Sequence, residues 1–513
     1  MDNYTKEGRG VRMQGLIGAR QVGIDLSADF SLPDYQPEIK RLLRVSAVVS
    51  PADQFIGVGS ADFTGTVDYC ILYSGNDGAL YSATHTEEYQ FSVPVEMTSD
   101  FEIGDGVTCD VEVRSETATG RVSAPRKLSL RSRLRADVRL YGTRVLEERS
   151  ECEDRAALER LCGEAICAHV FSGRGDSVTL EDEILFDAQW ADIRVISAEG
   201  QVFVAEADAG SGCVNCRGEV YLKLLCCHEN GAEAPVVQLR KLPFSQSVPV
   251  DGCEVNCDAC AHGVCSDLRI TVEEGRVLCE VAVRLQARAQ RNESVLYTRD
   301  LYSTAIENEN RYTELALPCA IKCANGNFSL NATLSAEEAG VRTGMSVWDV
   351  SVYPSVGAME RDHGKLYLTG KCRCHLILSD GEDVSAQEVE IPFRYEMDGA
   401  DGDVTSYDVA IDPISCRARM DGERISIDAE LAVCASVRGE TRAKMLTESH
   451  FGDPVKHSSA VYTVCYPAKS DTLWSVSKKY HRSVASVIDM NTLSSSASAD
   501  SPDSLSGISY LLV

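Results

Sequence analysis

Five potential metal ligands lie close together in the segment CEVNCDACAHGVC, near the middle of the chain. They are Cys253, Cys257, Cys260, His262 and Cys265. Structural zinc sites take four thiolate or imidazole ligands, commonly from pairs with two residues between them. Only Cys257 and Cys260 have that spacing here, and Cys213 and Cys216 form another such pair upstream. The spacing leaves three interpretations open: a structural zinc site, oxidative cross-linking of the thiols, or inert thiols.

A row of arginines offers a second kind of chemistry, the binding of carboxylate or phosphate groups. Arg131, Arg133, Arg135 and Arg139 alternate with apolar residues, so they share one face of a predicted strand. We expect them either to contact an acidic partner or to form an ordinary solvated face of a sheet.

Catalytic motifs are missing from the sequence. It contains no glycine-rich phosphate-binding loop, no HExxH pair on a helix and no nucleophile elbow. Carboxylates are abundant, and abundance alone indicates no acid–base pair. The sequence therefore predicts a binding protein and not an enzyme.

Composition narrows the class of binding partner. The chain has 50 Lys and Arg against 78 Asp and Glu, a formal net charge of −28. Binding to nucleic acid or to anionic lipid needs a cationic face, so both are disfavoured. The first 26 residues hold no apolar signal segment, and no apolar run is long enough to span a membrane. We expect a cytosolic protein whose 21 cysteines are mostly reduced.

The elements that carry these residues recur along the chain. Three landmarks repeat in the same order with a period of about 150 residues. They are Gly65, Gly218 and Gly370, then Phe91, Phe244 and Phe393, then Leu128, Val277 and Ile425. Each last landmark opens a strand in which apolar residues alternate, as when one side of a sheet is buried. Turn signals at Asn76–Gly78 and Ser379–Gly381 favour antiparallel hairpins. The repeat predicts three antiparallel, sandwich-like β units.

The expected boundaries place these units at 20–145, 175–305 and 325–440, with a terminal module at 461–513. In the joining segment 146–174, a helix is predicted from Asp154 to His169, because apolar residues fall at helical spacing there. These residues are Leu158, Leu161, Cys162, Ala165 and Ile166. The segment 441–460 loses the alternation and is predicted to be a linker.

The terminal module is predicted to fold as β-α-α-β. Short apolar strands are expected at 461–464 and 510–513, paired with each other. Asp471 or Thr472 can cap a first helix, and Ser483 a second. The apolar positions of these helices are Leu473, Val476 and Tyr480 in the first, and Val484, Val487 and Ile488 in the second.

Two segments carry a resemblance to known families. The opening DFSLPDYQPEIKRLLRVSAVV, with Pro33, Asp34, Pro37, Glu38 and Ile39, resembles the start of the SPOCS domain of bacterial endospore proteins. The module at 461–513 resembles a LysM domain. Tandem SPOCS units followed by a LysM domain are the layout of SipL-like spore-envelope morphogenetic proteins. The resemblance implies an adaptor in the mother-cell cytoplasm, at the forespore surface, whose LysM domain tethers the coat morphogenetic ATPase for coat assembly and forespore encasement.

The resemblance also implies candidate binding residues in the module. In glycan-binding LysM domains, two loops form the groove, and the matching positions here are Asp471, Thr472, Leu473, Ile488, Asn491 and Leu493. The usual glycine before Asp-Thr is Ser470, and the second loop is extended by SSSASADSPDS. Both departures disfavour glycan and favour a protein partner, for which Trp474, Lys478 and Lys479 are the candidates.

Each of these residues also has a structural interpretation. Trp474 suits a core, the lysines suit a solvated helix face, and Asp471 and Thr472 suit helix caps. A peptidoglycan-binding protein remains the alternative function.

Overall fold

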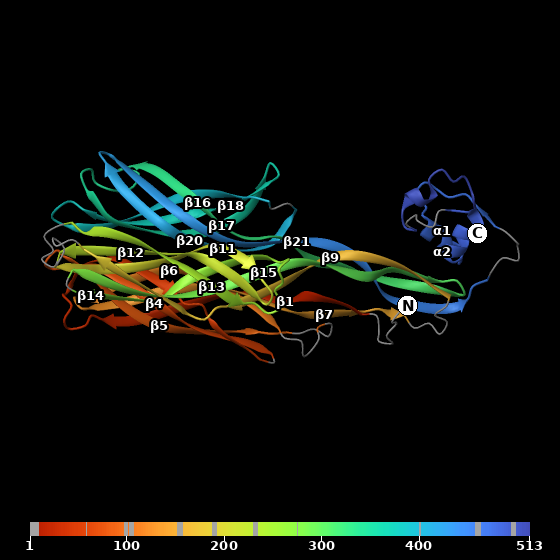
Figure 1. The fold of residues 1–513 in the computed structure, drawn as a ribbon, viewed down its shortest axis with the longest axis horizontal. Coiled ribbons are helices and arrows are strands. Elements are labelled where there is room, and N and C mark those ends of the chain that lie inside the picture. Colours follow the sequence, from red (N-terminus) through yellow and green to blue (C-terminus); the bar gives the residue numbers. More distant parts are fainter. Residues whose placement is uncertain are drawn as a thin grey trace.

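The computed structural model describes residues 10–57, 59–96, 101, 107–150, 157–186, 192–228, 234–273, 275–399, 402–456, 463–493 and 499–513. The prediction of a mainly β protein is confirmed, with 76% of the described residues in strands and 4% in helices. Among the described residues, no helix is long and apolar enough to cross a membrane. Figure 1 shows an elongated molecule whose strands run mostly along its length.

The strands form three consecutive units, each with its own core. Unit 1 contains β1 (Gly10–Ser31), β2 (Ile39–Val49), β3 (Asp53–Ile56), β4 (Ser60–Gly75), β5 (Leu80–Pro94), β6 (Thr108–Ala124) and β7 (Lys127–Glu147). Unit 2 contains β9 (Leu158–Arg174), β10 (Val178–Leu185), β11 (Ile193–Ala209), β12 (Cys213–His228), β13 (Val236–Pro249), β14 (Asp258–Glu273) and β15 (Arg276–Ser303). Unit 3 contains β16 (Ile306–Ser335), β17 (Ser346–Asp362), β18 (Lys365–Ser379), β19 (Val384–Met397), β20 (Val404–Asp421) and β21 (Arg424–Pro454). The short β8 (Arg149–Ser150) pairs in parallel with β21.

Each unit is a sandwich of two antiparallel sheets with the same strand order. In unit 1, one sheet runs β1-β7-β6, and in the other β4 pairs with both β2 and β5. The order recurs as β10-β15-β14 with β11-β12-β13, and as β16-β21-β20 with β17-β18-β19. Alternate residues of β7, β15 and β21 face inward and are buried, as the sequence pattern predicts.

A glycine under an aromatic ring marks the same point in every unit. The cross-strand pairs are Gly65–Tyr89, Gly218–Phe244 and Gly370–Phe393. A Cβ at any of the three glycines would clash with the ring opposite, so the close approach requires glycine. The predicted equivalence of Phe91 with the other two phenylalanines is wrong by two residues, since Phe91 pairs with Phe63. Both predicted hairpin turns are present, with Gly78 and Gly381 at positive φ.

The helix predicted from Asp154 to His169 is wrong for its described part, which begins at residue 157. Residues from Leu158 onward form β9, which pairs with the second half of β15. Its pattern is that of a half-exposed strand, because Cys162 and Ile166 face outward while Ala165 and Cys167 face inward. β9 and β10 together take the place that β1 holds in unit 1, so the part of the segment 146–174 from Leu158 onward belongs to unit 2.

The linker predicted at 441–460 is also wrong for residues 441–454, which continue β21 and pair with the first half of β16. Three two-stranded ribbons therefore extend beyond the sandwiches: β1 with β7, β9 with β15, and β16 with β21. We call these ribbons the stalk (Figure 1). Their shared core is Val11, Met13, Cys167, Leu315, Leu317, Ala443 and Met445. In residues 441–454 the buried positions include the small Ala443 and the polar Ser449, and a register shift opposite Arg311 and Tyr312 interrupts the alternation, so the sequence resembles a linker.

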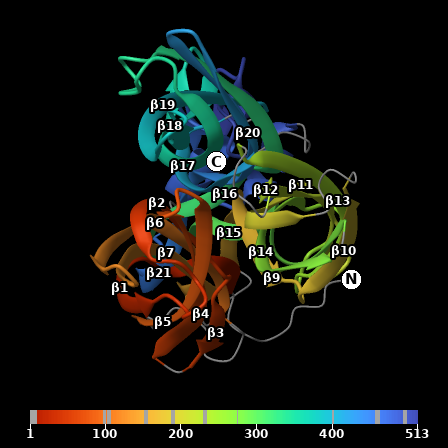
Figure 2. The ribbon, with the colours of Figure 1, turned by 90° about the vertical axis from the view of Figure 1, so that its left-hand side faces the viewer.

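The three units surround a common axis, as the end-on view of Figure 2 shows. Near this axis they share a small apolar cluster to which each unit contributes equivalent residues. Leu72, Leu225 and Ile377 lie seven positions after the repeated glycines. The cluster also contains Leu43, Ile196 and Trp348, each at a bulge in the strand beside them. Equivalent surfaces of the three units thus pack against one another around the axis, as subunits do in a cyclic oligomer. We call this arrangement of the three units the ring.

Buried charges join the units beside this cluster. Arg44 of unit 1 donates to Asp349 of unit 3 at 2.8 Å and to Glu199 of unit 2 at 2.6 Å. Lys223 of unit 2 lies 2.5 Å from Asp349. Arg44 and Asp349 occupy equivalent positions of their repeats, opposite Leu72 and Ile377. The copies have therefore diverged into complementary charges.

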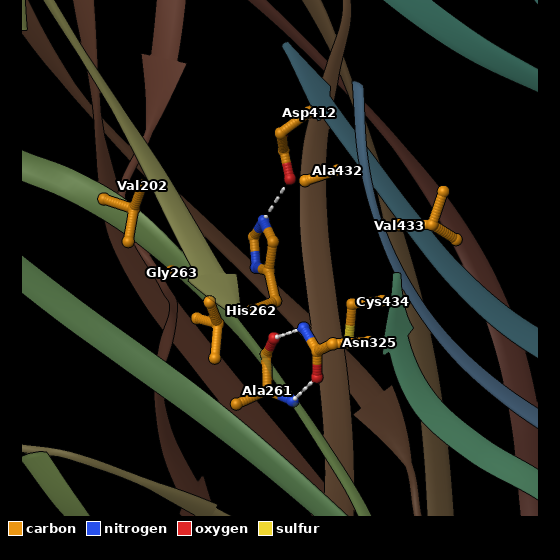
Figure 3. A pocket seen from close by; sticks show the side chains of 10 residues that line it. Val202, Ala261, His262, Gly263, Asn325, Asp412, Ala432, Val433 and Cys434 are labelled. Atoms are coloured by element: carbon orange, nitrogen blue, oxygen red, sulfur yellow. Dashed lines mark hydrogen bonds and ion pairs between the residues drawn. The ribbon is translucent and has the colours of Figure 1, made fainter. Parts of the chain in front are cut away.

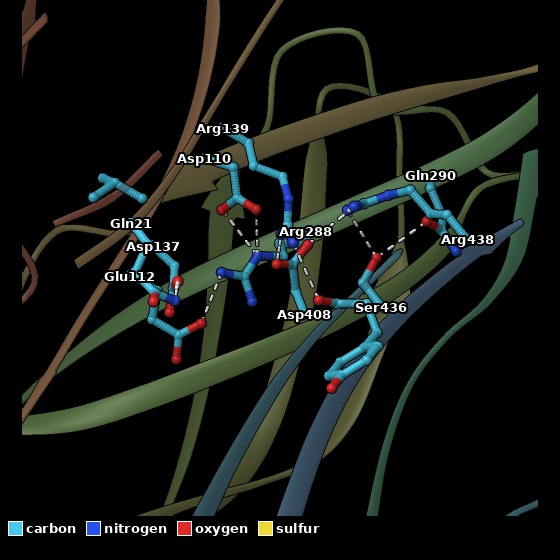
Figure 4. A network of polar contacts seen from close by, with 12 residues as sticks. Gln21, Asp110, Glu112, Asp137, Arg139, Arg288, Gln290, Asp408, Ser436 and Arg438 are labelled. Carbon is cyan, nitrogen blue, oxygen red and sulfur yellow. Dashed lines mark hydrogen bonds and ion pairs between the residues drawn. The ribbon is translucent and has the colours of Figure 1, made fainter. Parts of the chain in front are cut away.

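A second network of buried polar contacts joins the units through their other sheets, which contain β6, β7, β15 and β20 (Figure 4). Arg288 of unit 2 donates to both oxygens of Asp110 of unit 1 at 2.9 and 3.0 Å, and to Glu112 at 2.9 Å. The equivalent arginine of unit 1, Arg139, forms an ion pair with Asp408 of unit 3. One member of the predicted arginine row thus finds its acidic partner inside the chain.

The C-terminal module is a separate small fold. It contains β22 (Val464–Cys465), α1 (Leu473–Lys479), α2 (Val484–Asn491), the short helix η3 (Pro502–Leu505) and β23 (Leu511–Leu512). β22 pairs antiparallel with β23, so the expected order β-α-α-β is present with one added turn of helix. The predicted first strand begins at residues 461 and 462, which lie outside the described residues.

Candidate functional site

Helix α1 has two faces with different tasks. Leu473 and Val476 point into the core of the module, beside the half-buried Tyr480, as the sequence predicts. Thr472 caps the helix through a reciprocal pair of hydrogen bonds with Ser475. The second face carries Trp474, Ser477, Lys478 and His481, spaced by three, one and three residues, which places them on one side of the helix and the turn after it. We call it the docking face, because it lies against the stalk.

The docking face holds one carboxylate of the stalk. Trp474 Nε1 donates to Asp300 Oδ2 at 2.8 Å, and Lys478 Nζ lies 2.6 and 2.8 Å from the two carboxylate oxygens. Asp300 follows a register shift in β15, between Thr298 and Asp300. Such a bulge redirects the side chain that follows it. The end of β15 therefore presents Asp300 to the module.

The stalk orients the same carboxylate from its own side. Asn310 Nδ2 and the Tyr312 hydroxyl donate to Asp300 Oδ1 at 2.9 and 2.7 Å. Burial alone would raise the pKa of Asp300, but hydrogen bonds from Lys478, Trp474 and Tyr312 outweigh it and lower that pKa below the ordinary value. The carboxylate is therefore ionised at neutral pH.

Aromatic and backbone contacts surround this charged centre. The rings of Trp474 and Tyr302 meet edge to face with centroids 4.9 Å apart. The Tyr302 hydroxyl donates to the carbonyl of Arg482 at 2.7 Å, and His481 Nδ1 lies 2.9 Å from the carbonyl of Ser303. Trp474 is only 5% exposed, yet it is absent from the core cluster of the module. Its burial comes from the stalk and the neighbouring loop.

The loops expected to form a glycan groove are held by hydrogen bonds within the module. The backbone N–H of Trp474 donates to the carbonyl of Ala499 at 2.8 Å, and that of Leu473 to Ser504 Oγ at 3.3 Å. The extended second loop thus covers the start of α1. Asp471 Oδ2 accepts from the backbone N–H of Ala468 at 2.8 Å, which commits it to the first loop.

Most remaining candidates of the module serve its fold. Asn491 binds Leu512 through both its amide oxygen and its amide nitrogen, each at 2.8 Å, and so holds the last strand. Ile488 and Leu493 pack against the core of the module. Lys479 is exposed beside Tyr480. The structure thus brings Trp474 and Lys478 together at one contact and leaves the other candidates apart from it.

The structure disperses the five potential metal ligands. His262 Nε2 pairs with Asp412 Oδ2 of unit 3 at 2.9 Å, beside a narrow pocket between units 2 and 3 (Figure 3). Cys265 lies against Gly200 of β11, and Cys253 and Cys257 share a turn. Across the described part of the chain, no three His, Cys, Asp or Glu side chains are grouped to hold a metal ion.

Cys260 belongs to a different cluster, formed with Cys323 and Cys434 of unit 3. The Cys323 thiol donates to Cys260 Sγ at 3.1 Å. Hydrogen bonding with Cys323, together with burial, raises the pKa of Cys260 well above its ordinary value. The pKa of Cys434 is raised in the same way, so the thiols of Cys260 and Cys434 stay protonated and unreactive at neutral pH.

The rest of the arginine row faces solvent. Arg133 lies near Glu116 and Arg135 pairs with Asp137, while Arg131 is exposed. This agrees with an ordinary solvated face, apart from Arg139.

The sequence did not single out the stalk side of the contact. Asp300 and Tyr302 lie in YTRDLYS, which has strand alternation and no motif. The only signal was on the module, where Trp474 and Lys478 stand four residues apart on a helix.

Comparison of the chain with protein-family models, with curated proteins and with solved structures finds no match.

Proposed function

We propose that the chain is a non-enzymatic adaptor of bacterial endospore formation, which tethers the coat morphogenetic ATPase at the forespore surface through its C-terminal module. The observation that carries the protein-binding part of this proposal is the docking face. It already holds a protein surface, the end of the stalk, through Trp474 and Lys478. An aromatic anchor beside a cation is the composition of protein interface hot spots. The sporulation context rests on the resemblance of the opening motif and of the domain order.

The closed loops support a protein partner over glycan. A saccharide groove needs free donors at the loops, and the backbone N–H groups of Leu473 and Trp474 are already bonded within the module. The body of the molecule supports a scaffold role, because three sandwiches joined by buried ion pairs form a stiff support for one terminal binding module.

Two assays on the full chain test this function. Purified chain is mixed with the purified coat ATPase and, separately, with peptidoglycan sacculi. Saturable binding to the ATPase and none to sacculi is expected; the reverse result would establish the glycan alternative. In sporulating cells, a fluorescent fusion should encircle the forespore and lose that pattern when residues 463–513 are deleted. A fusion that stays diffuse in both forms would reject the role in encasement.

A further inference from the structure

The docking face forms a receptor for a single carboxylate. Two donors of the module, Trp474 Nε1 and Lys478 Nζ, converge on Asp300, which is 17% exposed at its side chain. The stalk supplies the other donors to this carboxylate, from Asn310, Tyr312 and the backbone N–H of Leu301. The stalk thus holds the carboxylate in place whether or not the module is docked, and the module adds a charge and an indole N–H.

The contact is separate from the core of the module. Neither Trp474, Lys478 nor His481 belongs to the cluster around Val487 and Leu511 that holds the module together. Undocking would therefore leave the module folded and would expose an indole beside an ammonium group. An exposed site of that composition fits an acidic segment with a neighbouring aromatic ring, as Asp300 and Tyr302 provide within the chain.

Building on the proposed function, we propose that the docking face is the partner-binding surface of the module, that it recognises an acidic segment of the partner, and that Asp300 and Tyr302 occupy it as an internal competitor. The partner and the stalk then use the same atoms, so the module binds only after leaving the stalk.

Covalent connection makes the stalk an effective competitor. An intramolecular ligand acts at a high local concentration without any further contact. The apparent dissociation constant of the partner rises by the inverse of the fraction of undocked molecules. Weakening the contact at Asp300 should therefore tighten binding of an acidic partner, whereas weakening it at Lys478 should not, because Lys478 is needed by both ligands.

Three variants of the full chain separate these effects. Asp300→Asn removes the competing charge from the stalk, and Lys478→Gln removes the cation of the receptor. Glu309→Gln is the matched control, since it removes the same charge as Asp300→Asn from an exposed position of β16. Undocking is followed by 19F NMR spectra of protein labelled with 5-fluorotryptophan. The chain has only 3 tryptophans, and the resonance of Trp474 reports the contact. Binding is measured with a random glutamate–tyrosine copolymer and, for charge specificity, a lysine–tyrosine copolymer.

We expect the 19F chemical shift of Trp474 to move to the value of a solvent-exposed tryptophan in Asp300→Asn and in Lys478→Gln. In Glu309→Gln the shift should equal that of the unmodified chain. Asp300→Asn should bind the glutamate copolymer about tenfold more tightly than the unmodified chain, and Lys478→Gln should gain nothing. An unmoved resonance in Asp300→Asn, an undocked module without tighter binding, or equal binding of both copolymers would each overturn the inference. The copolymers do not involve the coat ATPase, so failure of the chain to bind that ATPase would count against the proposed function alone.

Discussion

Single charged residues decide how the three similar units fit together. Arg44 and Asp349 are 2% and 3% exposed, and neither would be tolerated there without the other. Burial opposes ionisation, but Glu199 and Asp349 keep the pKa of Arg44 above its ordinary value. A pair of this kind favours one arrangement of three otherwise similar surfaces.

Asp349→Asn should lower the free energy of unfolding by about 3–5 kcal/mol, because it leaves Arg44 and Lys223 short of a buried partner. Denaturant titration of the full chain measures this loss. Asp383→Asn is the matched control, since it breaks the exposed Lys40–Asp383 pair between the same two units and should leave the transition unchanged. Equal losses in the two variants would contradict the assignment.

His262 should make the contact between units 2 and 3 depend on pH. Burial lowers the pKa of His262, but the carboxylates of Asp412 and Glu112 outweigh burial and the opposing Arg114, so the pKa lies above its ordinary value of about 6.5. The folded state favours the protonated form. Its stabilisation is therefore complete below about pH 6.5 and disappears as pH rises through the raised pKa.

The melting temperature of the unmodified chain minus that of His262→Gln measures this contribution. The difference should be larger at about pH 5.5 than at about pH 8.5. A difference that is constant, or that grows with pH, would show that the ion pair with Asp412 does not form.

At the scale of elements, the alternation of apolar residues predicted most strands but did not predict the parts of β9 and β21 that lie in the stalk. The buried positions of β7, β15 and β21 follow from the sequence, because sandwich strands bury every second residue. In β9 the apolar residues also fit helical spacing, and only pairing with β15 decides between the two. Pairings such as Arg44 with Asp349, 305 residues apart, leave no local trace in a sequence.

The repeated glycines should differ in their tolerance of alanine. A Cβ at Gly218 would lie 2.0 Å from the carbonyl oxygen of Phe203, whereas at Gly65 the nearest atoms belong to the Tyr89 ring, at 2.5 Å. A ring can turn more cheaply than a strand can shift. Gly218→Ala should therefore cost about 1–3 kcal/mol, and Gly65→Ala less, by denaturant titration. The opposite order would refute this account of the repeat.

The last strand should be essential to the module. Leu511 and Val513 are 0% and 4% exposed, and Asn491 holds the backbone of Leu512. Deleting residues 510–513 opens a core too small to absorb the loss. Hydrogen exchange should show that α1 and α2 are unprotected in the truncated chain. They should stay protected in the control Tyr510→Ala, because the Tyr510 side chain is exposed. Retained protection in the truncated chain would contradict the prediction.

At the scale of the whole molecule, three sandwiches and a stalk carry one small module at a distance from the ring. The period of the repeat was enough to predict three units, and the residue pattern of 461–513 predicted a small terminal fold with the order β-α-α-β. The ring and the stalk were not predictable, because they arise from contacts between units. The contact at Asp300 depends on the stalk, since β15 carries this residue there and Asn310 and Tyr312 on β16 orient it.

The most direct test of the proposed adaptor function is to measure the affinity of the full chain for the purified coat ATPase. One aromatic residue of the module is changed at a time. In the Asp300→Asn chain, whose docking face is no longer held by the stalk carboxylate, Trp474→Ala removes the anchor of the docking face and should weaken binding at least about tenfold. Tyr466→Ala changes an aromatic side chain that is 77% exposed and outside that face, and should leave the affinity unchanged. Unchanged affinity in Trp474→Ala, or equal losses in both variants, would contradict capture of the ATPase through the docking face.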